Sequence, residues 1–83
     1  MEGTAVTRCK MRVESVRRSI DAKGETESET VKLIAVYGTG DTENAKWSKW
    51  TPSASFEIQI NNPGAIGKLS KGHEYFVDFI PAN

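Results

Sequence analysis

Ser53-Ala54-Ser55-Phe56-Glu57-Ile58-Gln59-Ile60 is the stretch that decides the fold class of this chain. Four apolar residues alternate in it with four polar ones, and this strict period of two predicts a half-buried β-strand. Just before it lies Lys46-Trp47-Ser48-Lys49-Trp50, which contains both tryptophans of the chain. The sequence therefore joins its clearest core element to its most distinctive candidate surface.

Residues 5–20 and 30–37 alternate in the same way and predict two further strands, the first of them long. An antiparallel hairpin is expected, because one register brings both apolar faces together. The register pairs Cys9 with Tyr37, Met11 with Ala35, Val13 with Leu33, Arg17 with Glu29, and Glu14 with Lys32. The last two pairs carry opposite charges, which stabilise a hairpin by roughly 0.2–1 kcal/mol per pair.

Two local signals support this hairpin. Gly24 ends a three-residue loop, residues 22–24, at the position that needs the left-handed conformation. In the long strand the apolar positions change parity at Val16 and Ile20, which predicts a bulge or bend near Glu14–Val16. The acidic run Glu25, Glu27 and Glu29 is interpreted as solvated or paired charge of the hairpin and not as a metal site.

The rest of the chain predicts a loop, a short helix and a last strand. Residues 38–44 form a flexible surface loop that matches neither a phosphate-binding nor a calcium-binding pattern. Asn62 and Pro63 are typical of a helix start, but two glycines limit the helix in residues 62–69 to one or two turns. Residues 73–80 are the last strand, with Tyr75, Val77 and Phe79 inward.

These elements predict a single all-β domain over residues 1–83. We expect a small antiparallel β-sandwich or OB-like barrel of four or five strands, with one short helical turn before the last strand. The fifth strand exists only if Ala45–Trp50 supplies it. Without it, an open sandwich completed by a partner is at least as good a solution.

Composition narrows the classes of function. Eleven basic and eleven acidic side chains give zero net charge, which weakens a nucleic-acid interpretation. Cys9 is the only cysteine, so neither an internal disulfide nor a cysteine-rich zinc site is expected. The chain shows no run of about 18 apolar residues and no signal-peptide pattern, so we expect an intracellular product without a membrane partner.

Catalytic signals are weak. His73 is the only histidine, near the start of the last strand, and its neighbour Glu74 points to the opposite face. Cys9 faces the core in the expected register, where a thiol is a small inert hydrophobe. No pair of carboxylates is singled out for acid–base chemistry. The sequence therefore predicts no enzyme activity, no cofactor and no metal.

Three groups of residues are candidates for binding a partner. Lys46, Trp47, Lys49 and Trp50 interleave cations with aromatic rings, a pattern that suits base stacking as well as protein interfaces. Of the two rings, Trp50 is expected to cover the core and Trp47 to be the contact residue. Arg8, Lys10 and Arg12 form a basic stripe on the outer face of the first strand, either simply solvated or facing an acidic partner. Ile34 and Val36 make the outer face of the second strand apolar.

Three segments resemble a small protein encoded by many tailed bacteriophages and prophages. They are Arg8-Cys9-Lys10-Met11-Arg12-Val13, Trp47-Ser48-Lys49-Trp50-Thr51-Pro52-Ser53-Ala54-Ser55, and Asn61-Asn62-Pro63-Gly64-Ala65 leading to Gly72-His73-Glu74-Tyr75-Phe76-Val77-Asp78-Phe79. The resemblance implies a phage origin and carries over no functional residue. Small phage β-domains of this kind are similar to capsid cement (decoration) proteins, to inhibitors of host systems and to single-strand DNA binders.

The leading hypothesis is a virion cement protein, made in the host cytoplasm, that binds the major capsid protein, itself, or both. A single-stranded nucleic-acid-binding, OB-like protein is one alternative. An inhibitor or sequestering protein that acts on a host factor is the other.

Overall fold

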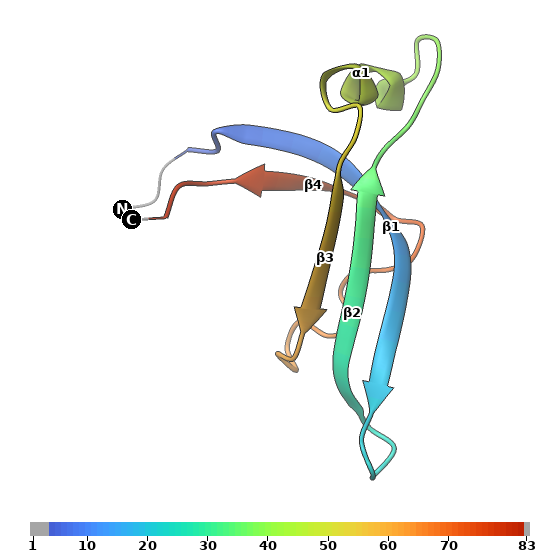
Figure 1. Cartoon of the computed structure of the whole chain (residues 1–83), viewed down its shortest axis with the longest axis vertical. Coiled ribbons are helices and arrows are strands. Elements are labelled where there is room, and N and C mark those ends of the chain that lie inside the picture. The colour runs from blue at the N-terminus through green and yellow to red at the C-terminus, as the bar shows by residue number, and fades with distance from the viewer. Residues whose placement is uncertain (1–3, 83) are drawn as a thin grey trace.

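The computed structural model describes residues 4–82 as one antiparallel sheet with a short helix. The strands follow the order β3-β2-β1-β4 across the sheet (Figure 1). The elements are β1 (Thr7–Ile20), β2 (Thr26–Ala35), α1 (Glu43–Trp50), β3 (Ser55–Ile60) and β4 (Glu74–Phe79). The all-β class and four antiparallel strands are confirmed.

The β1–β2 hairpin confirms the expected register in its upper half and corrects it in its lower half. Met11 pairs with Ala35 and Val13 with Leu33, as expected. The register then shifts between Val13 and Ser15, because β1 carries the predicted extra residue at Glu14. Glu29 consequently faces Arg18, and the expected pair with Arg17 was wrong.

Both ends of the hairpin follow from local chemistry. At the turn Gly24 has φ 85°, and the Asp21 side chain accepts hydrogen bonds from the backbone N–H groups of Lys23 and Glu25. The predicted loop is therefore confirmed. At the other end β2 stops at Ala35, so Tyr37 does not pair with Cys9 and its side chain is 78% exposed.

The sheet is open. β1 pairs with β2 and with β4, but β3 and β4 are free edges within residues 4–82. The described chain therefore forms neither a closed barrel nor two packed sheets, and its extents are 48 × 36 × 16 Å. The possible fifth strand, Ala45–Trp50, lies in α1 instead.

Helix α1 is a correction to the expected loop at residues 38–44 and to the possible strand at Ala45–Trp50. Thr42 caps the helix by accepting a hydrogen bond from the N–H of Ala45. Glu43 in the first turn and Lys49 in the last turn complement the helix dipole. The sequence signal for this helix was the capping threonine followed by a glutamate. The helix was still missed, because it has eight residues, fully buries none of them and therefore shows no clear apolar period.

The helix expected in residues 62–69 is reduced to turns. The backbone carbonyl of Asn62 accepts from the N–H groups of Ala65 and Ile66, so a helical turn begins there. Gly67, at φ 84°, prevents it from continuing. This segment links β3 to β4, the two opposite edges of the sheet, and brings Leu69 against the core.

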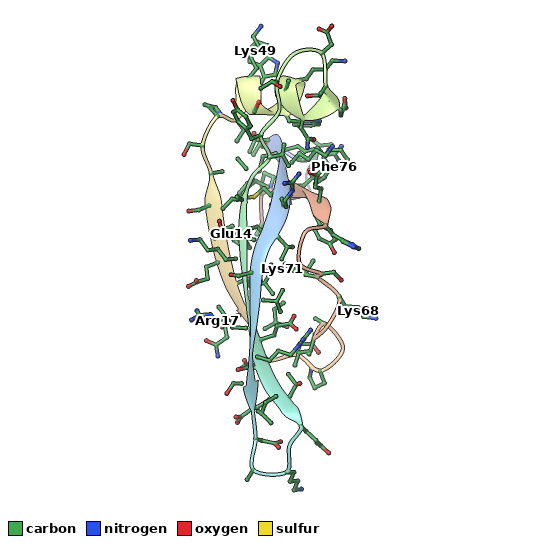
Figure 2. The ribbon with its side chains drawn as sticks, turned by 90° about the vertical axis from the view of Figure 1, so that its right-hand side faces the viewer. Glu14, Arg17, Lys49, Lys68, Lys71 and Phe76 are labelled. Carbon is green, nitrogen blue, oxygen red and sulfur yellow. The ribbon has the colours of Figure 1, made fainter. Side chains whose placement is uncertain are left out.

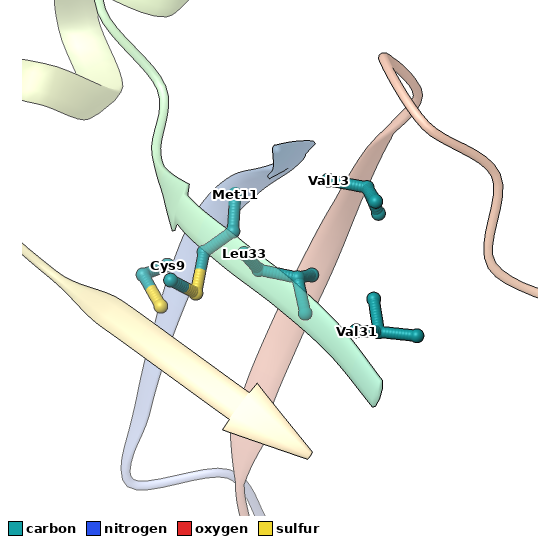
Figure 3. Packing of buried hydrophobic residues seen from close by; sticks show 5 residues of the cluster. All are labelled: Cys9, Met11, Val13, Val31 and Leu33. Atoms are coloured by element: carbon teal, nitrogen blue, oxygen red, sulfur yellow. The ribbon is translucent and has the colours of Figure 1, made fainter. Parts of the chain in front are cut away.

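The core lies on one face of the sheet. Its buried side chains come only from β1 and β2: Cys9, Met11, Val13, Val31 and Leu33 (Figure 3). Ile58, Leu69 and Val77 pack around them from the other segments. Because fully burying one such side chain contributes roughly 1.5–3 kcal/mol, this small cluster is the main source of stability.

Candidate functional site: an open apolar groove

The most distinctive surface feature is an apolar groove on the core face, where β1 and β4 extend beyond β2. Its volume is about 200 Å³. The residues that line it are Thr7, Cys9, Met11, Thr51, Ala54, Ser55, Phe56, Val77 and Phe79. Phe56 remains 40% exposed and Phe79 50%, although both belong to the apolar face of their strands. The sheet thus leaves part of its apolar face uncovered.

The groove exists because the segment that links β3 to β4 covers a different part of the core face. Leu69 packs against the core cluster, and the carbonyl oxygen of Lys68 and the N–H of Ser70 both contact the Tyr75 hydroxyl. This anchors the crossing segment near the first residues of β4. Val77 and Phe79, farther along the same strand, line the groove.

The opposite face of the sheet is covered at one end by α1. Phe76 of β4 pairs with Lys10 of β1, and the backbone carbonyl of Lys10 accepts from the N–H of Val36. The three residues therefore form a row on one face. Trp47 lies with its ring centroid 5.2 Å from that of Phe76, which is labelled beside the helix in Figure 2.

The structure places the two tryptophans differently from expectation. Trp47 is partly buried against Phe76 and joins α1 to the sheet. Trp50 is 78% exposed and does not cover the core, and the Lys49 ammonium lies 5.2 Å above its ring. Because Thr51 lines the groove, Trp50 is adjacent in sequence to that site. Lys46 is exposed on the same helix.

The two apolar residues on the outer face of β2 also differ from each other. Val36 is only 4% exposed, so a partner does not reach it in this conformation. Ile34 is half-buried opposite Arg12. The sheet does not close over this face, and the described residues bury Val36 but leave Ile34 half-buried.

The basic stripe is neutralised within the chain. Arg8 makes a bidentate pair with Asp78, through Nε at 2.6 Å and Nη2 at 2.9 Å. Arg12 Nη2 lies 2.7 Å from Glu74, and Lys10 Nζ lies 3.6 Å from the same carboxylate. The stripe is therefore a row of ion pairs between β1 and β4 and presents little net positive charge to an acidic partner.

These ion pairs set the titration of the acidic residues. Hydrogen bonds from Arg12 and then from Asn44 hold the pKa of Glu74 below its ordinary value. The hydrogen bond from Arg8 does the same for the pKa of Asp78. Burial raises the pKa of the Cys9 thiol, with the charge of Asp78 as a smaller cause, so this thiol is a poor nucleophile at neutral pH.

One buried carboxylate lies away from these pairs. Glu29 is fully buried at the lower end of the core face, where Arg18 Nε is 2.9 Å away and the N–H of Gly67 donates at 3.4 Å. The carboxylate joins β1, β2 and the crossing segment, which is a structural task. Glu25 and Glu27 are exposed, as expected.

The described residues do not gather metal-ligating side chains into a cluster. No group of three or more His, Cys, Asp or Glu side chains there is placed to hold a metal ion. His73 is exposed, in the turn that precedes β4. Across residues 4–82, no helix has the length and apolar character needed to cross a bilayer.

Sequence reasoning missed the groove, although it placed most of the lining residues on the correct face. It expected Phe56, Val77 and Phe79 to point inward, and they do. What it lacked was the position of the covering segment. The sequence did contain one hint of the groove. A single short segment between β3 and β4 carries too few apolar side chains to cover the apolar face of four strands.

Comparisons of the chain with protein-family models, with curated proteins and with solved structures gave no match.

Proposed function

We propose that this chain is a non-enzymatic virion protein of a tailed bacteriophage that decorates the capsid by binding the major capsid protein. The observation that carries the proposal is the open apolar groove, because a sheet face with exposed phenylalanines gains stability when a protein surface covers it. The resemblance of three segments to phage-encoded proteins supports the choice of partner.

In the proposed contact with the capsid, the groove forms the buried centre of the interface and α1 lies at its edge. Phe56 and Phe79 provide aromatic edges at the groove, and Trp50 lies beside it in sequence with most of its ring in solvent. Exposed aromatic side chains of this type dominate the energetics of protein interfaces. On the opposite face of the sheet, the ion pairs between β1 and β4 leave little net positive charge, which does not favour a polyanion as the partner.

The proposed mechanism is thermodynamic linkage between binding of this chain and assembly of the capsid. A protein that binds only the assembled shell stabilises it by an amount that grows with occupancy. Many copies, each making a modest contact, therefore raise the cost of releasing any one capsid subunit. Such a role needs neither catalysis nor a cofactor.

Quantitative mass spectrometry of purified virions tests the proposal. We expect the chain at a fixed ratio to the major capsid protein, and virions from a deletion strain that lose infectivity at lower temperature. Adding back purified protein restores heat resistance. Absence of the chain from virions contradicts the proposal.

Two substitutions locate the contact. Phe79→Ser removes an apolar ring from the groove and is expected to weaken binding to deletion-strain capsids by about 2 kcal/mol, the cost of a hot-spot residue. Tyr37→Ser is the matched control, because Tyr37 is 78% exposed and does not line the groove. Equal loss in both variants would place the contact elsewhere.

Binding of single-stranded nucleic acid is the second candidate, and the exposed ring of Trp50 with the Lys49 ammonium above it favours it. It predicts salt-dependent binding that Trp50→Ala weakens by roughly 1–3 kcal/mol per stacked base. Fluorescence titration with labelled oligonucleotides at low salt measures this, and absence of binding removes the candidate.

A further inference from the structure

The outer edge of β4 is an unpaired strand edge. Within the described chain β4 pairs only with β1. The carbonyls of His73 and Phe79 both point to β1, where they accept from the N–H groups of Val13 and Val6. Because backbone groups alternate in direction along a strand, the N–H and C=O groups of Glu74, Phe76 and Asp78 point outward.

This edge lacks the features that normally prevent a second strand from adding. β4 contains no lysine and no proline, and Pro81 follows only after its end. Its two acidic side chains, Glu74 and Asp78, are each held in an ion pair with an arginine of β1. Phe76, Phe79 and Ile80 are each at least 50% exposed.

We propose that two copies of this chain pair through β4 in an antiparallel, two-fold symmetric contact that joins their sheets. The contact goes beyond the proposed capsid role and does not depend on it. The outward backbone groups of the two strands would complete each other's hydrogen bonds. The partner's strand is then an identical copy of Glu74–Phe79.

Side-chain chemistry selects one register. A pairing centred on Phe76 places Glu74 opposite Asp78, and one centred on Asp78 places that residue opposite itself, so both oppose like charges. An axis that falls between two residues sets the two faces of the sheet against each other. An axis at Tyr75 opposes only residues 74–76 of the two strands, because the remaining residues of β4 then face residues 71–73. The pairing centred on Val77 has none of these faults. It sets Tyr75 opposite Phe79 twice, and Glu74 opposite Ile80 twice.

The other edge, β3, is a poorer candidate for the same contact. Phe56 is its only large apolar residue with substantial exposure, because Ile58 and Ile60 pack against the core. Glu57 stands near the middle of that edge with 61% of its side chain exposed and only a 4.0 Å contact to Arg17. An exposed charge in this position disfavours pairing.

Pairing through β4 also joins apolar surface that is now separate. Val77 and Phe79 line the groove, and a two-fold axis at Val77 brings the grooves of both copies to the same continuous sheet. A dimer would therefore present two linked grooves, and linked sites bind a lattice more tightly than single ones.

Sedimentation equilibrium of the purified chain, over roughly 1 µM to 1 mM, measures the dimer dissociation constant. Two variants at one position test the register, because Ile80 is 51% exposed and faces Glu74 of the other copy. Ile80→Glu creates two like-charge contacts and is expected to raise the dissociation constant about 2- to 30-fold. Ile80→Lys loses the same apolar surface but creates two favourable contacts, so its dissociation constant stays at or below that of the wild type.

These measurements can contradict the proposed dimer in two ways. A chain that remains monomeric throughout the range overturns the proposal, and so do two Ile80 variants with equal dissociation constants. Hydrogen exchange supplies an independent readout that needs no substitution. The amides of Glu74, Phe76 and Asp78 are expected to become protected as concentration rises, whereas concentration-dependent protection of β3 would refute the assignment to β4.

Discussion

At the scale of single residues, the fold tolerates little change of side chain at two positions, Gly38 and Glu29. At Gly38 an added Cβ would lie 2.5 Å from the backbone nitrogen of Ala45 and 2.6 Å from the Thr42 hydroxyl. The helix therefore approaches the chain that leads into it as closely as a glycine permits. At Glu29 the fold buries a carboxylate completely and holds it with a single cation. Neither feature has a sequence signal, because each depends on a contact with a distant or newly formed element.

Gly38→Ala is expected to destabilise the chain by about 1–3 kcal/mol, because the obstructing atoms belong to the backbone and the cap of α1. Urea unfolding monitored by tryptophan fluorescence measures this, since Trp47 packs against the sheet. Gly64→Ala is the control: its Cβ would meet its nearest atom at 3.5 Å, an ordinary contact. A Gly38→Ala protein as stable as the control would show that α1 shifts freely.

Arg18→Met is expected to cost about 1–3 kcal/mol, because it leaves the buried Glu29 carboxylate without its cation. The double variant Arg18→Met/Glu29→Leu is expected to recover much of the loss, since it removes the charge that needs compensation. Chemical denaturation of the two single variants and the double variant gives the coupling energy. Strict additivity of the single effects would contradict the pairing.

At the scale of elements, the β1–β2 and β1–β4 ladders share the apolar core face, and β1–β4 adds a row of ion pairs on the other face. The alternation in β1 and β2 predicted their register correctly as far as Val13, because the buried face specifies it. Below that point the bulge lies where the sequence predicts it, and it shifts the partner of Glu29 from Arg17 to Arg18. The partners of Arg8 and Arg12 could not be predicted, since nothing in the sequence shows that β4 lies beside β1.

The β1–β4 ion pairs predict acid sensitivity. Glu74 and Asp78 have pKa values lowered by folding, so the unfolded chain takes up their protons first as the pH falls. The stability from these pairs is complete above the ordinary carboxyl pKa of about 4 and is lost as the pH drops through the lower folded values. Glu74→Gln is expected to be less stable than the wild type at neutral pH and to converge with it in acid.

Urea unfolding at a series of pH values checks this expectation. Glu27→Gln is the control, because Glu27 is an exposed strand residue. A stability difference between wild type and Glu74→Gln that persists unchanged in acid would show that the charge of Glu74 contributes nothing.

At the scale of the whole molecule, the fold is a single sheet with a compact core at one end and an uncovered apolar surface at the other. The class was predictable because period-two alternation is a local property of β1, β2, β3 and β4. The sequence left both a closed and an open sheet possible, because closure depends on whether residues 45–50 form a fifth strand. The structure forms a helix there, which begins at the Thr42 cap.

The uncovered surface predicts that the native chain binds a fluorescent apolar dye such as anilinonaphthalene sulfonate. Phe79→Ser is expected to reduce the signal by roughly half, because exposed contiguous apolar surface is what such dyes bind. Tyr37→Ser is expected to leave it unchanged. A signal that appears only in acid or urea would indicate that the groove is inaccessible in the native state.

The extra residue at Glu14 has a consequence for how substitutions distribute along β1. Before it, odd-numbered residues such as Cys9 and Val13 face the core, and after it even-numbered ones such as Val16 do. A complete mutational scan would therefore show a shift in phase. Positions that do not tolerate charge are Cys9, Met11 and Val13, and the next is Val16 rather than Ser15. β1 thus contributes one inner face to its pairing with both β2 and β4. A single residue inserted or deleted near Glu14 would turn half of that face to solvent.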